Sequence, residues 1–102
     1  MLVAFSIAPS GSAAADGSVS EAVAAAVRVV RQSGLPNRTS SMFTEIEGEW
    51  DEVMEVVRRC VDVVAATSPR VSLVLKADVR PGWSGQLDAK VDRVEQHLAG
   101  EG

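Results

Sequence analysis

Few residues in this chain have types that could do covalent chemistry. A nucleophilic cysteine needs a nearby base or cation and some exposure to solvent. The single cysteine, Cys60, instead lies among Val56, Val57 and Val64, which indicates a buried thiol. The single histidine, His97, falls near the end of the last predicted helix, where it complements the helix dipole. The sequence therefore predicts no catalytic residues and no enzyme.

The sequence also lacks the residue patterns that metal binding and phosphate binding require. Carboxylates gather between residues 45 and 52, but no C-x-x-C, paired histidine or calcium-loop spacing accompanies them. Asp51 and Glu52 instead fit the first turn of a helix. The stretch Pro9–Ser12 precedes a helix but lacks the lysine of a phosphate loop, although a helix start at Ser18 could hold an anion. We expect neither a metal nor a cofactor.

A row of side chains on one predicted strand, residues 71–79, has two interpretations. Val71, Leu73, Leu75, Ala77 and Val79 form an apolar face, and the opposite face carries Ser72, Val74, Lys76, Asp78 and Arg80. This second face is either an open sheet surface made soluble by charge, or the lining of a subunit interface or polar pocket. Val74 in its middle favours partial burial by another subunit.

The elements that position these residues follow from the hydrophobic periodicity. Leu2–Ala8 is a predicted strand ended by Pro9, and Ser10–Gly17 is a flexible loop. A helix begins at Ser18 with a capping box to Glu21 and ends at Gly34 in a left-handed C-cap. Its apolar seam is predicted to contain Val19, Val23, Val27 and Val30.

The second half of the chain follows the same logic. Asn37–Glu47 is either one long strand or two short strands with a turn near Ser41-Met42. A helix is predicted from about Glu49 to Ala66, with the stripe Val53, Val56, Val57, Cys60 and Val64. A third helix, Gln86–Leu98, has the seam Leu87, Val91, Val94 and Leu98, and residues 99–102 are expected to fray. The order β-α-β(β)-α-β-α predicts an α+β sandwich, ferredoxin-like if the middle segment is a hairpin.

Length and composition limit the partners. The chain has 102 residues, enough for one domain, with a core at about 2–80 and a C-terminal turn and helix at about 81–99. The net charge of −4 and the lack of a basic run argue against nucleic acid and anionic membranes. No stretch approaches the ~20 apolar residues of a membrane span. A lone cysteine favours a reducing, cytoplasmic location, and no signal peptide is expected.

Several segments together resemble the YkoF-like thiamine-binding protein family. The matching segments are Phe5–Pro9, Ser18–Ser20, Ser33–Leu35, Ser41-Met42, Thr44–Gly48, Asp51–Val53, Arg70-Val71 and Lys76–Arg80. The resemblance implies a ferredoxin-like βαββαβ domain that binds thiamine or its hydroxymethylpyrimidine part without catalysis. It also implies homo-oligomers, usually tetramers, built by pairing sheet faces. The chain departs from the family pattern in its long Ser10–Gly17 loop, which borders the expected pocket.

The resemblance also implies a set of ligand-binding residues, namely Ser6, Ser18, Ser20, Met42, Phe43, Thr44, Glu47 and Asp78. The serines and the threonine would supply neutral hydrogen bonds to an aminopyrimidine. The methionine and phenylalanine would pack against a ring, and either carboxylate would face the thiazolium cation. Two alternatives remain, a regulatory or structural oligomerisation module without this ligand, and a small dimeric α/β-barrel enzyme.

Overall fold

The sheet of this protein is built from four strands with β1 near its centre. The computed structural model describes residues 1–10 and 18–101, and the side chains of all of these except 18, 19 and 101. The elements are β1 (Leu2–Ser10), α1 (Ser18–Gln32), β2 (Asn37–Thr39), β3 (Thr44–Glu47), α2 (Trp50–Ala65), β4 (Arg70–Asp78) and α3 (Gln86–Glu101).

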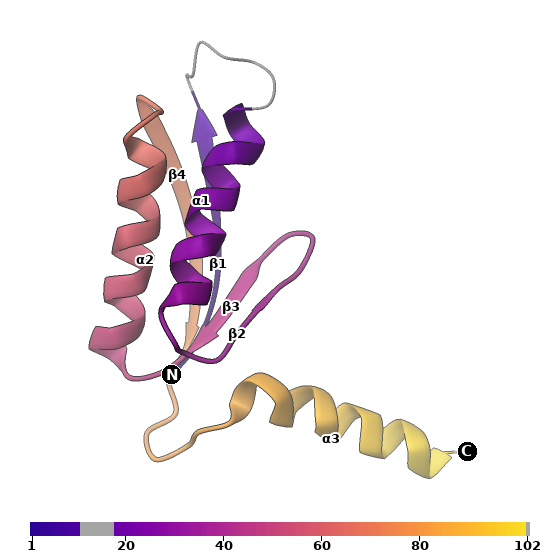
Figure 1. Cartoon of the computed structure of the whole chain (residues 1–102). Coiled ribbons are helices and arrows are strands. Elements are labelled where there is room, and N and C mark those ends of the chain that lie inside the picture. Colours follow the sequence, from indigo (N-terminus) through magenta and orange to yellow (C-terminus); the bar gives the residue numbers. More distant parts are fainter. Residues whose placement is uncertain (11–17, 102) are drawn as a thin grey trace.

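The strand order is that of a ferredoxin-like fold. The strands lie in the order β2-β3-β1-β4, and each neighbouring pair is antiparallel. The segment 37–47 forms two short strands with a turn at residues 40–43, so the hairpin alternative is the one the structure adopts. Figure 1 shows α1 and α2 side by side over one face of this sheet. The predicted α+β sandwich is therefore confirmed.

One correction concerns the end of β1. Pro9 was expected to stop this strand, but β1 continues through Pro9 opposite Val71 and ends at Ser10 opposite Arg70. Proline is tolerated because β3 pairs with β1 only from Leu2 to Phe5, which leaves one edge of β1 without a partner strand beyond Phe5. Proline has no backbone N–H, and among the described residues no neighbouring strand on that edge needs one from Pro9. The expected loop at 11–17 lies outside the described residues.

The core lies between the sheet and the two helices. The predicted stripe of α2 is confirmed, because Val53, Val56, Val57, Cys60 and Val64 are all buried. They meet Val3, Phe5 and Ile46 from the sheet. Gly34, after α1, has a φ of 80°, as predicted for the C-cap.

The buried face of α1 differs from the prediction. Its core residues are Ala22, Ala26 and Val30, while Val23 is 38 % exposed. The three core positions recur at i, i+4 and i+8, and two of them are alanines, which allow α1 to approach its neighbours closely. Val30 is therefore in the core as predicted, whereas Val23 and Val27 of the predicted seam lie to the side of the contact with α2 and the sheet. The side chain of Val19 and the capping contact of Ser18 lie outside the described residues.

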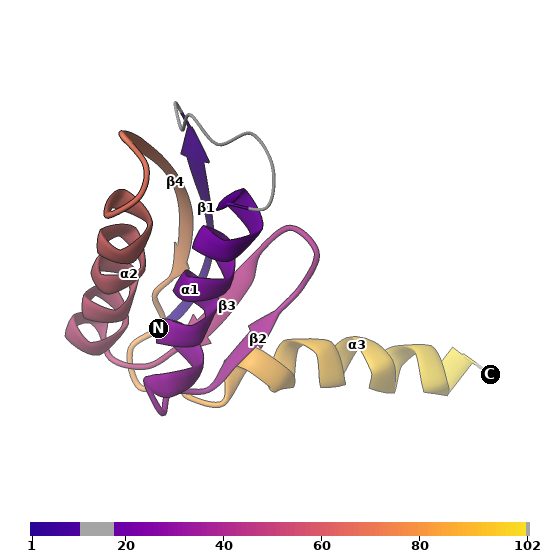
Figure 2. The ribbon, with the colours of Figure 1, turned by 45° about the horizontal axis from the view of Figure 1, so that its top comes forward.

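Helix α3 leaves the body of the molecule. Figures 1 and 2 both show it starting near β2 and β3 and extending away from the sheet to the C-terminal end. Leu87 in its first turn is buried, whereas Val91, Val94 and Leu98 are each about half exposed. The helix also continues to Glu101, three residues beyond its predicted end at Leu98, and the expected fraying of residues 99–102 stays a prediction. No helix among the described residues has the length and apolarity needed to cross a membrane.

Candidate functional site: a pocket between α1 and the β2–β3 hairpin

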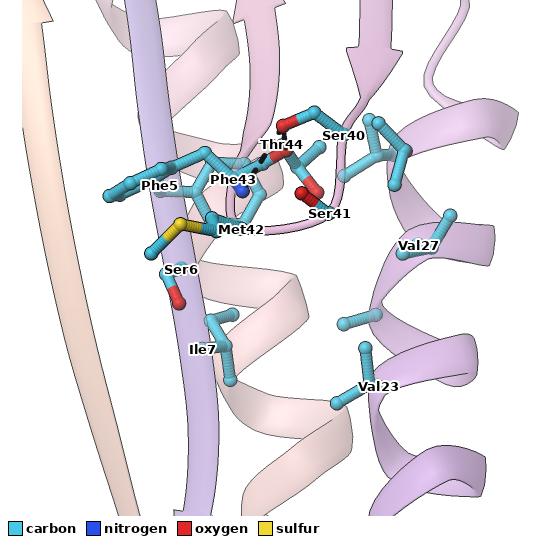
Figure 3. A pocket seen from close by; sticks show the side chains of 13 residues that line it. Phe5, Ser6, Ile7, Val23, Val27, Ser40, Ser41, Met42, Phe43 and Thr44 are labelled. Atoms are coloured by element: carbon cyan, nitrogen blue, oxygen red, sulfur yellow. Dashed lines mark hydrogen bonds between the residues drawn. The ribbon is translucent and has the colours of Figure 1, made fainter.

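A pocket of about 110 Å³ lies where the β2–β3 hairpin reaches past β1 toward the flank of α1. Figure 3 shows its side chains converging from β1, from α1 and from the turn of the hairpin. The lining residues are Phe5, Ser6, Ile7, Val23, Ala26, Val27, Val30 and Thr39 to Thr44. All of these side chains are apolar or carry a neutral hydroxyl group. The pocket therefore offers hydrogen bonds and apolar contact without a formal charge.

The hairpin turn that forms one wall is held by Ser40. Its backbone N–H and its hydroxyl both donate to the Phe43 carbonyl oxygen at 2.9 Å, and its Oγ accepts the Phe43 N–H at 3.3 Å. The dashed contact in Figure 3 marks this clamp. It fixes the turn so that Met42, 74 % exposed, and Phe43, 37 % exposed, stand at its tip. Two large apolar side chains are thus available at the pocket mouth.

The helix wall follows from the way α1 packs. Since Ala22 and Ala26 make the core contacts, Val23 and Val27 are turned toward the hairpin and line the pocket. Figure 3 shows both valines on the side of α1 that faces Ile7 and the hairpin turn. The sequence pattern assigned them to the core. The positions of these valines could have been inferred from Ala22 and Ala26, which are spaced i, i+4 and form the stripe of α1 that faces the core.

Half of the predicted ligand-binding residues meet at this pocket. Ser6, Met42, Phe43 and Thr44 all border it. Ser6 does so although its position between Phe5 and Ile7 gives its side chain the opposite face of the strand. Ser20 lies on an adjoining hollow of α1. The side chain of Ser18 lies outside the described residues.

Glu47 has a different environment from the predicted one. It is 6 % exposed, and its carboxylate accepts the backbone N–H groups of Gln86 at 2.9 Å and Leu87 at 3.2 Å. These are the first two residues of α3, so the carboxylate satisfies N–H groups that have no partner within the helix. Glu47 thus anchors α3 to the sheet and does not line the pocket. Its role as the counter-charge of a ligand stays a prediction.

Asp78 lies on the sheet face opposite to α1 and α2. It borders a hollow of about 140 Å³ together with Leu2, Ala4 and three other charged residues, Glu45, Lys76 and Lys90. Its carboxylate is bonded to the ammonium of Lys90, and this hydrogen bond, with the charge of Lys90, lowers the pKa of Asp78 below its ordinary value. The structure therefore separates Asp78 from the hairpin pocket by the thickness of the sheet.

Residues with catalytic or metal-binding potential lie elsewhere. Cys60 is fully buried in α2, its Sγ–H donates to the Ala26 carbonyl at 3.4 Å, and burial raises its pKa to about 11. The thiol is therefore protonated at neutral pH, as the surrounding valines predicted. Within residues 1–10 and 18–101, no three His, Cys, Asp or Glu side chains cluster as metal ligands.

Sequence reasoning missed part of the pocket. Thr39, Ser40 and Ser41 supply hydroxyl groups from the hairpin, and Ile7 and Val27 supply apolar wall. The three hydroxyl residues form a continuous polar run, Thr39 to Ser41, between two predicted strands. Such a run is typical of any turn, so it carried no specific signal before the hairpin was known to lie beside α1.

The strand order and the neutral pocket define a ferredoxin-like α+β protein with a small hydroxyl-lined hollow beneath one helix. A sequence profile described as "Thiamine-binding protein" matches residues 3–95. The chain therefore belongs to the thiamine-binding protein family, which confirms the family inferred from the sequence segments.

Individual relatives agree with this placement. A UPF0045 protein from Mycobacterium bovis is 54 % identical over 99 residues, which cover 96 % of this chain and 94 % of the relative. A solved structure of a domain of unknown function, DUF77, from Bacillus cereus is 32 % identical, with a TM-score of 0.78 and coverage of 88 % and 85 %. A structure described as a putative thiamine biosynthesis/salvage protein from Thermotoga maritima shares the fold, with a TM-score of 0.77, 24 % identity and coverage of 91 % and 96 %.

Proposed function

We propose that this protein binds thiamine or a hydroxymethylpyrimidine-like ligand in the hairpin pocket and performs no catalysis on it. The observation that carries the proposal is the lining of that pocket, which combines hydroxyl groups with apolar walls and, among the residues that the structure describes, holds no ionisable side chain. A neutral aminopyrimidine ring has hydrogen-bonding edges and apolar faces, and such a lining matches both. Membership of the thiamine-binding protein family supports the same ligand class.

The size of the pocket favours one ring over two. Its volume of about 110 Å³ is well below the ~300 Å³ at which pockets for larger ligands begin. An aminopyrimidine fits this space, and the thiazolium ring of thiamine would then lie at the mouth. There the exposed Met42 and the Phe43 ring are available to pack against it. Burying the neutral ring and leaving the cation near water also avoids the cost of desolvating a charge.

The absence of catalysis is proposed on chemical grounds. General acid–base or nucleophilic catalysis requires an ionisable or activated side chain within reach of the ligand. The side chains around the pocket are Ser, Thr, Met, Phe, Ala, Val and Ile. The buried thiol of Cys60 is bonded to the Ala26 carbonyl and raised in pKa, which makes it a poor nucleophile. These features support binding in preference to turnover.

We further propose that the protein forms a cytoplasmic homo-oligomer, a tetramer assembled through its sheet faces. The face of the sheet opposite α1 and α2 exposes Val74, at 58 %, and α3 exposes Val91, Val94 and Leu98. Apolar side chains gathered on one helix and one sheet face favour association over free exposure. The same feature favours a second candidate function, an oligomerisation module without this ligand.

Calorimetric titration with thiamine and with hydroxymethylpyrimidine tests the binding function. We expect saturable binding by the wild type and its loss in Val23→Phe, which fills the pocket from a position that is 38 % exposed and outside the core. Val79→Phe is the matched control, because Val79 is also exposed and does not line the pocket. If neither compound binds the wild type while it remains oligomeric, the oligomerisation module is the better account.

A further inference from the structure

The hairpin pocket continues onto a second, wider hollow along the flank of α1. The two hollows share Val23 and Val27 as walls. The second hollow is a shallow surface open to solvent, and its described lining comes from α1 alone: besides the two valines it contains Ser20, Ala24, Arg28, Arg31 and Gln32. A ligand too large for the 110 Å³ pocket can therefore extend along α1 without moving the core.

Two arginines give this second hollow a positive charge. Arg28 and Arg31 lie one helical turn apart at i and i+3, and Arg31 follows Val27 at i+4, so all three side chains emerge from neighbouring positions. Both arginines are exposed. Across the residues that the structure describes, the ion pairs use Arg38, Arg58 and Lys90, and neither Arg28 nor Arg31 is among them.

The charges around the pair leave it available for an anion. The described acidic residue on α1 is Glu21, two turns before Arg28, and among residues 1–10 and 18–101 no carboxylate lines either hollow. The chain as a whole carries a net charge of −4, so two neighbouring arginines that pair with no described carboxylate are a local exception to its overall charge. A guanidinium group binds phosphate oxygens through paired N–H donors, and Gln32, the residue after Arg31, adds a neutral donor in the same hollow.

Resting on the proposed function, we infer that the preferred ligand is a phosphate ester of a neutral aminopyrimidine alcohol, with its ring in the hairpin pocket and its phosphate on Arg28 and Arg31. The ring needs the uncharged lining, and the phosphate needs the adjoining arginines. Thiamine itself gains nothing from the two arginines, because it carries no phosphate and its thiazolium ring is placed beside Met42 and Phe43 at the pocket mouth. The site thus discriminates by charge as well as by ring shape.

The test compares hydroxymethylpyrimidine with its monophosphate ester by calorimetry at fixed pH and ionic strength. We expect the ester to bind on the order of tenfold more tightly, since two charge-assisted contacts are added. The preference should weaken as salt rises, because both arginines are exposed. In Arg28→Gln and Arg31→Gln the ratio of the two Kd values should fall toward one. Arg59→Gln, which removes an exposed arginine from α2, is the matched control and should keep the wild-type ratio.

The outcomes separate this inference from the proposed function. If the alcohol binds and the ester binds equally or less tightly, the inference is overturned while the proposed function stands. If the preference survives in the Arg28→Gln/Arg31→Gln double variant, the phosphate lies elsewhere and the inference is likewise overturned. If neither compound binds, the inference is overturned, and the proposed function fails as well only when thiamine also does not bind. Inorganic phosphate should compete weakly with the ester, and equal competition would show a phosphate site independent of the ring, contrary to the inference.

Discussion

Replacing Glu47 by glutamine tests how α3 is attached to the sheet. The wild-type carboxylate accepts two N–H groups, from Gln86 at 2.9 Å and from Leu87 at 3.2 Å, and the residue is 6 % exposed. Glutamine has the same shape but only one acceptor oxygen. Its NH2 group takes the place of the second oxygen, so one of the two backbone N–H groups faces another donor and loses its hydrogen bond. The negative charge at the start of the helix is lost as well.

The expected size of this effect follows from these contacts. Hydrogen bonds to a charged group contribute about 1.5–3 kcal/mol, and loss of an N-cap contact costs about 0.5–2 kcal/mol. Other contacts still attach α3 to the rest of the protein in this variant. They are the buried Leu87 side chain and the ion pairs Arg38–Asp88 and Lys90–Asp78. We therefore expect the opening of the first turn of α3 to become easier by about 2 kcal/mol, which is roughly thirtyfold in its equilibrium constant.

Amide hydrogen exchange measures this opening directly. The amides of Gln86 and Leu87 should exchange about thirtyfold faster in Glu47→Gln, while amides of α2 keep their protection. Glu45→Gln is the control, because Glu45 lies two residues earlier on the same face of β3 and removes the same charge without a bond to α3. Unchanged exchange at residues 86 and 87 would refute the anchoring role. Ligand titration of the same variant separates the two roles of Glu47, since a counter-charge would also lose affinity for a cationic ligand.

Three further predictions test the core, the sheet face and the thiol. Ile46→Ala should lower the urea-unfolding free energy by about 2–5 kcal/mol because Ile46 is fully buried, whereas Val79→Ala, at 56 % exposure and outside β4, should change it by less than about 0.5 kcal/mol. Asp78 has a lowered pKa in the folded state, so its contact with Lys90 stabilises the fold above the unfolded pKa of about 4. This stabilisation is lost as the pH falls through the lower pKa of the folded state. The variant Asp78→Asn should therefore remove this contribution to the pH dependence of amide exchange in α3. Cys60, with a pKa raised to about 11 by burial, should react with a thiol reagent only as fast as the protein opens, and rapid stoichiometric labelling of the native state would contradict this.

The fold followed from the sequence because each element carried a local signal. Alternation marked β4, helical spacing marked the buried stripe of α2, and Gly34 with Pro36 marked the end of α1. The signals that failed were those that depend on neighbours in space. Pro9 is tolerated because of an unpaired edge that only the sheet order reveals.

The pocket was predicted only in part, and for the same reason. Met42, Phe43 and Thr44 were assigned from their place in the family segments, and all three border the pocket. Val23 and Val27 were assigned to the core because valine is more apolar than alanine, but close packing against α2 selected the smaller side chains. Glu47 could not be placed from sequence, because its partners lie about forty residues later at the start of α3.

The alanine contacts of α1 have a consequence for how ligand preference could diverge among relatives. Ala22 and Ala26 pack in the core, and Ala26 also borders the pocket, whereas Val23 and Val27 line the pocket without belonging to the core. Exchanging either valine for a smaller or larger side chain would reshape the cavity with little loss of folding free energy. Selection could then retune which ring is accepted while the scaffold is conserved, because two of the pocket-lining positions of α1, Val23 and Val27, lie outside the core.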